Sequence, residues 1–184
     1  MDKKKVNNAA YRTTIDIGAG KGKQLAWYLV NVLFLQNPFN IFSSLKVFLL
    51  RSFGARVGTG VVIKPSVNIK YPWKLVIGDH AWIGEEAWID NLSEVRIGAH
   101  VTISQGALLL TGSHDHSRTT FDFMSEPIVL EDGCWIGARA TVLGGVRCGT
   151  HAILGVSAVA SQDLKPYVIY QGNPASPVMV RTIS

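Results

Sequence analysis

The sequence predicts a parallel β-helix made of six-residue repeats, and three recurring features of residues 57–165 predict it. An aliphatic or small anchor residue returns every six positions, a small or branched residue follows most anchors by four positions, and glycine often follows an anchor directly. A period of six fits neither an amphipathic helix nor an alternating strand. It indicates short strands joined by tight turns, with three strands in each coil and inward-pointing anchors.

The anchors form four runs, which are separated by two short shifts and one longer insertion. The shifts fall at Pro72 and Trp73 and near Leu92 and Ser93, where coils of 20 residues replace coils of 18. These positions are expected to be turns that bulge by two residues. In chain order, the anchors are Val57, Ile63, Ile69, Ile77, Ile83, Ile89, Ile97, Ile103, Leu109, Leu130, Ile136, Val142, Cys148, Leu154 and Ala160.

A stack of coils has open ends, which need caps. Two helices within residues 24–53 are expected to cap the first coil, and the first of them runs from Gln24 to about Gln36, before Asn37 and Pro38. The second stops at Gly54, and its apolar residues at helical spacing are Ile41, Leu45, Phe48 and Leu49. The same helices, beside a basic arm, would also suit a membrane surface.

The chain is expected to be one functional domain in three parts. Residues 1–56 form a basic N-terminal arm and helical cap, and residues 57–165 form the β-helix with an excursion loop at 111–127. Residues 166–184 form an extended C-terminal tail, because prolines and a glycine interrupt them. The composition, with 47% hydrophobic and 17% charged residues, is that of a globular protein.

Charge and cysteine content limit the partners and the compartment. Residues 1–56 hold nine Lys/Arg and two Asp/Glu, whereas residues 57–184 hold nine and eleven. No motif that reads nucleic acid accompanies the basic arm, so a polyphosphate ligand or an anionic membrane surface is expected instead. The two cysteines match neither a zinc motif nor a disulfide framework, which favours a reducing compartment. The polar start shows no signal-peptide pattern, and no apolar run is long enough for a spanning helix.

The repeat also assigns several reactive side chains to structural positions. His80, His100 and His151 all follow an anchor by three residues, so we expect exposed turn residues there. Cys134 and Cys148 occupy inward positions and are expected to be packing residues rather than nucleophiles.

The excursion loop is the predicted location of the chemistry. It interrupts the anchor pattern and holds the two remaining histidines, His114 and His116, and loops on a rigid scaffold often carry function. A neutral imidazole can take a proton from a hydroxyl that attacks an acyl carbonyl. The candidates to orient the ring are the carboxylates of Asp90, Asp115 and Glu126. The two histidines could instead bind zinc, but no third ligand stands out, so no metal is expected.

Four stretches carry a resemblance to a known family: residues 88–92 (WIDNL), 111–115 (TGSHD), 127–138 (PIVLEDGCWIGA) and 171–175 (QGNPA). The chain resembles the hexapeptide-repeat acyltransferases, and within them the galactoside, maltose and nodulation O-acetyltransferases and the colanic acid biosynthesis acetyltransferases. The resemblance implies a left-handed coil, against the usual right-handed rule for parallel crossovers. It also implies a homotrimer with coenzyme A in a groove between subunits.

The resemblance assigns roles residue by residue. His114 matches the family's catalytic histidine, whereas His116 falls at a variable position. Ala138 matches a position whose backbone N–H faces the thioester, which suits an oxyanion donor. Asp90 and Asn91 lie one coil before the loop and are expected to line the acceptor site. The residues that match the coenzyme-contacting stretch are Gly155, Val156, Ser161 and Gln162.

Two positions depart from the family. Gln162 stands where lysine is common, and Ser176 stands where arginine is common. Basic side chains normally neutralise the coenzyme phosphates. Lys165 or Arg181 would therefore have to take over that role.

We therefore expect a trimeric, cytoplasmic O-acetyltransferase that uses acetyl-CoA as cosubstrate and acts on a sugar hydroxyl in surface polysaccharide biosynthesis. Direct attack is expected, because no activated Ser or Cys lies beside the histidine. The N-terminal helices suggest peripheral contact with the inner membrane face. The alternatives are an acetyltransferase of another acceptor (an amino sugar, a small alcohol or an antibiotic) and a metal-binding solenoid resembling the γ-type carbonic anhydrases.

Overall fold

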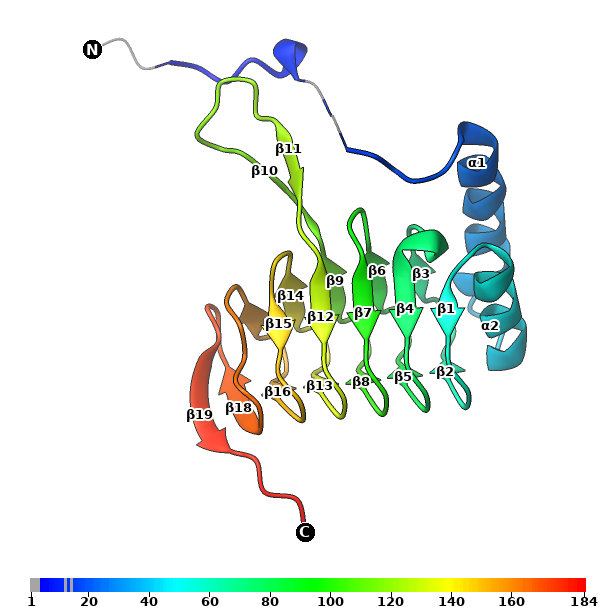
Figure 1. Ribbon diagram of the computed structural model, residues 1–184, viewed down its shortest axis with the longest axis vertical. Coiled ribbons are helices and arrows are strands. Elements are labelled where there is room, and N and C mark those ends of the chain that lie inside the picture. The colour runs from blue at the N-terminus through cyan, green and yellow to red at the C-terminus, as the bar shows by residue number, and fades with distance from the viewer. Residues whose placement is uncertain (1–3, 12, 14) are drawn as a thin grey trace.

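The computed structural model is a left-handed parallel β-helix with a helical cap at one end (Figure 1), as the repeat and the resemblance predict. It describes residues 4–11, 13 and 15–184; residues 1–3 of the expected basic arm lie outside the described residues. Three parallel sheets form the faces of the solenoid. The first face contains β1 (Arg56–Val57), β4 (Leu75–Ile77), β7 (Val95–Ile97), β12 (Ile128–Leu130) and β15 (Arg147–Cys148).

The other two faces complete five coils of three strands. The second face contains β2 (Val62–Ile63), β5 (Trp82–Ile83), β8 (Thr102–Ile103), β13 (Trp135–Ile136), β16 (Ile153–Leu154) and β18 (Val168–Gln171). The third face contains β3 (Asn68–Ile69), β6 (Trp88–Asp90), β9 (Leu108–Leu110), β14 (Thr141–Leu143) and β17 (Val159–Ala160).

The predicted anchors form the core. All of them except Val57 are buried. Each anchor stacks on its counterpart in the next coil, as Ile63 does on Ile83 and Ile83 does on Ile103. Burying one such aliphatic side chain stabilises the fold by about 1.5–3 kcal/mol, so the core fixes the register of every coil.

The three histidines lie in turns and the two cysteines in the core, as predicted, but His151 is half-buried rather than exposed, because the Tyr167 ring stacks on it. His80, His100 and His151 have φ values of 56°, 57° and 56°, in the left-handed region of a tight turn. The rings of His80 and His100 stack with their centroids 5.3 Å apart. Cys134 and Cys148 are free and buried, and burial raises the pKa of the Cys134 thiol to about 11.

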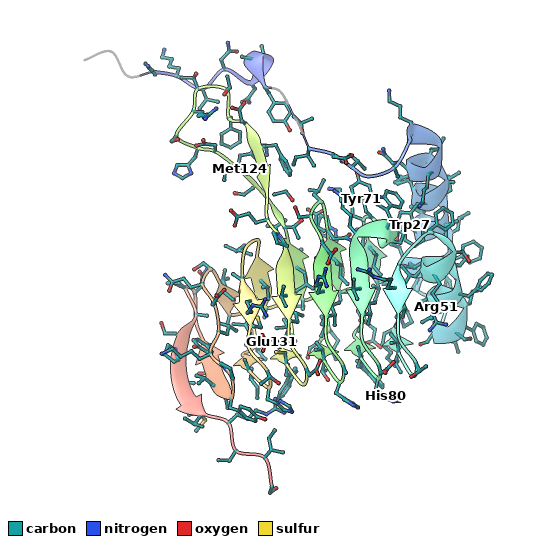
Figure 2. All side chains as sticks on the ribbon, viewed as in Figure 1. Trp27, Arg51, Tyr71, His80, Met124 and Glu131 are labelled. Atoms are coloured by element: carbon teal, nitrogen blue, oxygen red, sulfur yellow. The ribbon has the colours of Figure 1, made fainter. Side chains whose placement is uncertain are left out.

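The cap is formed by α1 (Lys21–Val30), which continues into η2 (Asn31–Leu35), and by α2 (Ser43–Ser52). Figure 2 labels Trp27, which lies between α1 and the first coil and donates its indole N–H to the Ile69 carbonyl at 2.8 Å. No helix among the described residues has the length and apolar character needed to cross a bilayer.

The apolar side of α2 does not face the solenoid, although its helical spacing suggested that it would. Ile41, Leu45 and Phe48 are exposed, whereas Lys46 and Leu50 are fully buried. The physical reason is the open edge of the first coil, whose carbonyls need donors. Lys46 supplies them: its Nζ donates to the carbonyl of Lys64 at 2.7 Å and to that of Ile63 at 3.3 Å.

The C-terminal segment is more regular than the extended tail that its prolines suggested. Leu164 bridges Cys148 on the first face, and β18 pairs in parallel with β16. β19 (Ser176–Val180) then folds back antiparallel to β18. The short elements that remain are η1 (Asn8–Ala10), η3 (Pro72–Lys74), β10 (Gly112–His114) and β11 (Phe123–Ser125).

Candidate active site

The predicted excursion loop is a β-hairpin that leaves the solenoid after the third coil. β10 and β11 pair antiparallel, with His114 opposite Phe123. Figure 1 shows the hairpin projecting from the solenoid, with the N-terminal segment lying along its tip. The backbone N–H of Asn7 donates to the Thr119 carbonyl at 2.8 Å, which fastens this segment to the hairpin.

Aromatic rings and one carbonyl hold the His114 ring. The Phe121 ring stacks on it with the centroids 4.4 Å apart, and the Phe123 ring meets it edge-on at 5.1 Å. The ring of Tyr11, from the N-terminal segment, lies 5.9 Å away. His114 Nδ1 is 2.9 Å from the Phe121 carbonyl oxygen. A carbonyl can only accept, so Nδ1 carries the hydrogen, and Nε2 of the neutral ring has a free lone pair.

None of the three carboxylates expected to orient His114 is its partner in this structure. Asp115 accepts from the backbone and hydroxyl of Ser117, which lowers the pKa of its carboxyl. Asp90 pairs with Lys70 at 2.8 Å on the third face. Glu126 lies over Gly145, in the turn after β14. A backbone carbonyl therefore does the positioning that we expected from a carboxylate.

Asn91 is a structural residue in the second bulged turn. It is fully buried, and its side-chain amide pairs with both backbone groups of Tyr71: Oδ1 accepts from the N–H at 2.9 Å and Nδ2 donates to the carbonyl at 2.6 Å. These bonds replace a strand ladder where the two extra residues interrupt it. Both polar atoms of the Asn91 side chain thus bond within the solenoid, and the acceptor contact that we expected of it stays a prediction.

The residues matched to the coenzyme site lie on different edges of the solenoid. Ala138, Gly155 and Val156 occupy the turns between the second and third faces. Among the described residues, no group accepts a hydrogen bond from the backbone N–H of Ala138 or Val156. Two adjacent coils thus offer free donors along one edge. Ser161 and Gln162 are exposed on another edge, after β17.

The two cationic candidates differ in their availability. Lys165 is exposed. Arg181 instead donates from one guanidinium nitrogen to the carbonyls of Gly133 and His151, at 3.0 and 3.1 Å. It ties the C-terminal segment to two turns through this one nitrogen, and its contact with the coenzyme phosphates stays a prediction.

Two pockets lie along the third face of the solenoid, and only the first is lined by residues of the hairpin. One, of about 260 Å³, lies between the base of the hairpin and the later coils, and Ser113, Glu126 and Ser161 are among its lining residues. The other, of about 430 Å³, lies between α1 and the first two coils. It combines aromatic rings with amides and one amine: Trp27, Tyr28, Tyr71, Trp88, Gln24, Asn31, Gln36, Asn68 and Lys70.

Within the described part of the chain, no three His, Cys, Asp or Glu side chains gather into a metal-binding group. His116 is exposed at the turn of the hairpin. The contributions of Phe121 and Tyr11 to the site were not predicted. The Phe121 contact runs through its backbone carbonyl, which leaves no signal in the residue type, and Tyr11 is more than 100 residues away in the sequence.

Comparison with known proteins identifies the family of the chain. Over 152 residues the chain is 41% identical to WcaF of Escherichia coli K12, named as a colanic acid biosynthesis acetyltransferase, with 83% of each chain covered. The chain belongs to the hexapeptide-repeat acetyltransferases. A second relative of this acetyltransferase, nodulation protein L of Rhizobium meliloti, is 30% identical over 132 residues, which cover 70% of this chain and 72% of that protein. No protein-family model matches the chain.

Solved structures show the same fold for this acetyltransferase. The hexapeptide-repeat acetyltransferase VCA0836 of Vibrio cholerae superimposes with a TM-score of 0.79 at 22% identity, covering 89% of this chain and 93% of that one. A galactoside acetyltransferase in complex with coenzyme A gives a TM-score of 0.76 at 22% identity, over 88% and 82%. At this identity the likeness establishes the fold alone.

Proposed function

We propose that this acetyltransferase moves the acetyl group of acetyl-CoA to a hydroxyl of a saccharide, with His114 as the general base. The observation that carries the proposal is the bond between His114 Nδ1 and the Phe121 carbonyl. In the neutral ring it leaves the lone pair on Nε2, the atom that would accept the proton. The packed rings of Phe121 and Phe123 hold the imidazole in place, which a positioned base requires.

The reaction would proceed by direct attack. Nε2 takes the proton of the sugar hydroxyl as its oxygen forms a bond to the thioester carbonyl carbon. A free N–H such as that of Ala138 would stabilise the resulting oxyanion. The carbon–sulfur bond then breaks, and the leaving thiolate takes the proton from the imidazolium. No covalent intermediate on a cysteine is proposed, because both thiols of the chain are buried and are not available as nucleophiles.

Acetyl-CoA would bind along the edge that carries Ala138 and Val156, whose free N–H groups suit the amides of its pantetheine arm. The exposed hydroxyl of Ser161 and the amide of Gln162 would contact it from the neighbouring edge, and Lys165 would face its phosphates. Solved relatives support this cosubstrate: the V. cholerae enzyme has been solved with acetyl coenzyme A, and the galactoside enzyme with coenzyme A.

A saccharide of a surface polysaccharide is the acceptor we propose. The E. coli relative is named for colanic acid biosynthesis. The 430 Å³ pocket beside α1 presents Tyr71 and Trp88 together with the amides of Gln24 and Asn68. No residue of the hairpin lines it, so it would hold a part of the saccharide away from the reacting hydroxyl. Aromatic rings can pack against the apolar face of a sugar, while amides pair with its hydroxyls.

We also propose that the enzyme works as a trimer in the cytoplasm. The trimer follows from the family resemblance, which places the coenzyme between adjacent subunits. The cytoplasm is supported by the two free cysteines, which suit a reducing compartment.

The test is thiol release from acetyl-CoA with a panel of acceptors, with the product identified by mass spectrometry and NMR. The panel contains neutral sugars and oligosaccharides, amino sugars, a small alcohol and chloramphenicol. The proposal expects O-acetylation of a neutral saccharide at a rate above that of every other class. N-acetylation of an amino sugar or O-acetylation of chloramphenicol as the dominant activity would contradict the acceptor. Stoichiometric zinc in the purified protein would contradict the mechanism.

A further inference from the structure

The cap helices differ from most surface helices in that they carry apolar side chains on their outer side as well as on their inner side. Their inward side carries the polar Asn31 and Lys46 beside Trp27, Leu35 and Leu50, all buried. Most helices at a water surface keep polar residues outside and apolar residues inside. The outer side here is apolar, and we call it the outer cap face: Leu25, Tyr28, Leu29, Val32, Leu33, Phe34, Phe39, Ile41, Phe42, Leu45 and Phe48, all exposed.

The outer cap face is too large to be incidental. Leu25, Tyr28, Leu29, Val32 and Leu33 follow one stripe of a helix, at the spacing i, i+3, i+4, i+7 and i+8. In the turn before α2, Phe39 is 89% exposed, Ile41 68% and Phe42 64%. Soluble monomers rarely expose a contiguous apolar surface of this kind unless something covers it. Figure 1 places both helices at one end of the solenoid, beyond β1.

The charges around the outer cap face indicate what covers it. Residues 17–78 contain eight Lys/Arg and no Asp/Glu. Lys21 and Arg56 are exposed at the start of α1 and in β1. Lys23 and Arg51 are exposed too, but the Lys23 amine lies over the Trp73 ring and the Arg51 guanidinium donates to the carbonyls of Val57 and Gly58. Apolar side chains bordered by cations are the pattern of a helix that lies in the headgroup region of an anionic bilayer.

We infer that the outer cap face docks the enzyme on an anionic lipid bilayer. A second copy of the chain is the less suitable occupant, because face-to-face contact would bring together two copies of a segment, residues 17–78, that holds eight Lys/Arg and no Asp/Glu. Like charges placed opposite each other oppose association. Leu25 and Tyr28 also line the 430 Å³ pocket, but Phe39, Phe42 and Phe48 line neither pocket, so substitutions of these three test the docking separately from the acetyl transfer.

The test is flotation of the purified enzyme with vesicles of phosphatidylcholine, with and without phosphatidylglycerol, at low and physiological ionic strength. Wild type is expected to float with the phosphatidylglycerol vesicles and to bind less as salt rises. The variant Phe39→Ser/Phe42→Ser/Phe48→Ser is expected to bind at least about tenfold more weakly, because three apolar side chains are lost. The matched control is Val178→Ser/Met179→Ser/Val180→Ser, which removes three exposed apolar side chains from β19 and is expected to bind as wild type does.

The rate of acetyl transfer to a soluble acceptor checks that each variant is folded. The variant Phe39→Ser/Phe42→Ser/Phe48→Ser, called the Phe39 variant, is expected to keep the rate of wild type. Wild type that does not bind the anionic vesicles at low salt would overturn the inference. Equal binding by both triple variants would also overturn it. A smaller oligomer for the Phe39 variant, together with no vesicle binding by wild type, would show that the face joins copies of the chain instead.

Discussion

One carbonyl selects the tautomer of a neutral His114 ring that the proposed chemistry requires. Because the Phe121 carbonyl can only accept, the hydrogen of the neutral ring lies on Nδ1 and the lone pair on Nε2. A carboxylate at the same position would also stabilise the imidazolium. With a neutral carbonyl, the positive charge that forms during proton transfer is compensated less, which favours prompt return of the proton to the leaving thiolate.

Lys46 is a buried amine that donates to carbonyls of the first coil. Burial lowers the pKa of its amine from 10.5 to about 8. The folded state therefore binds this proton less tightly than the unfolded state. Below about pH 8 the amine is protonated in both the folded and the unfolded state, and burying its charge lowers the stability by a constant amount. Between pH 8 and pH 10.5 the folded state loses this proton first, so the free energy of unfolding rises with pH.

We predict that the free energy of unfolding of wild type, relative to Lys46→Met, increases between pH 8 and pH 10.5 by on the order of 1–3 kcal/mol. Urea unfolding of both proteins at a series of pH values measures the difference, and groups common to both cancel. A difference that is flat over this range would show that the amine stays charged in the cap.

At the scale of elements, the hairpin depends on close packing at its base. A Cβ on Gly112 would come within 2.7 Å of the Phe123 ring and 3.0 Å of Leu92. Phe123 contacts the His114 ring edge-on. A methyl group on Gly112 should therefore displace Phe123 and, through it, the proposed base.

We predict that Gly112→Ala lowers kcat by at least about tenfold, because small displacements of a positioned base are costly. Its melting temperature should stay close to that of wild type, since the hairpin lies outside the core of stacked anchors. Gly22→Ala is the matched control: no atom lies within 4 Å of a Cβ there, so activity should be unchanged. Full activity of Gly112→Ala would contradict the role given to Phe123.

The sequence predicts some of these elements and not others. The spacing of Ile63, Ile83 and Ile103 predicts the coils, because each anchor must meet its counterpart in the next coil. The loss of that spacing predicts the hairpin. The orientation of α2 could not be predicted in the same way, since Lys46 is buried for its hydrogen bonds to carbonyls of the first coil. The position of the Phe121 carbonyl beside His114 depends on the path of the backbone, and the type of side chain does not reveal that path.

At the scale of the whole molecule, the cap and the proposed base are separated along the solenoid axis. The hairpin leaves the third coil. Two coil spacings of about 4.8 Å and a helix of about 10 Å therefore lie between the outer cap face and the point where the hairpin leaves the solenoid. On a bilayer, the enzyme would hold His114 about 20 Å above the lipid headgroups. An acceptor carried on a lipid would have to extend its sugars over that distance.

The proposed trimer makes a further prediction at this scale. Light scattering coupled to size-exclusion chromatography should give a mass of about three times the 20.0 kDa chain. Dilution below the association range should remove activity together with the trimer, because the coenzyme groove needs two subunits. A monomer with full activity would contradict the proposed placement of the coenzyme.

The measurement that most directly tests the central claim is the rate of acetyl transfer by His114→Ala, with His116→Ala as the matched control from the same hairpin. The account predicts that His114→Ala loses on the order of 100-fold or more in kcat, the amount a general base contributes. His116→Ala should keep a rate close to that of wild type. A full rate in His114→Ala, or an equal loss in both variants, would contradict the assignment of His114 as the base.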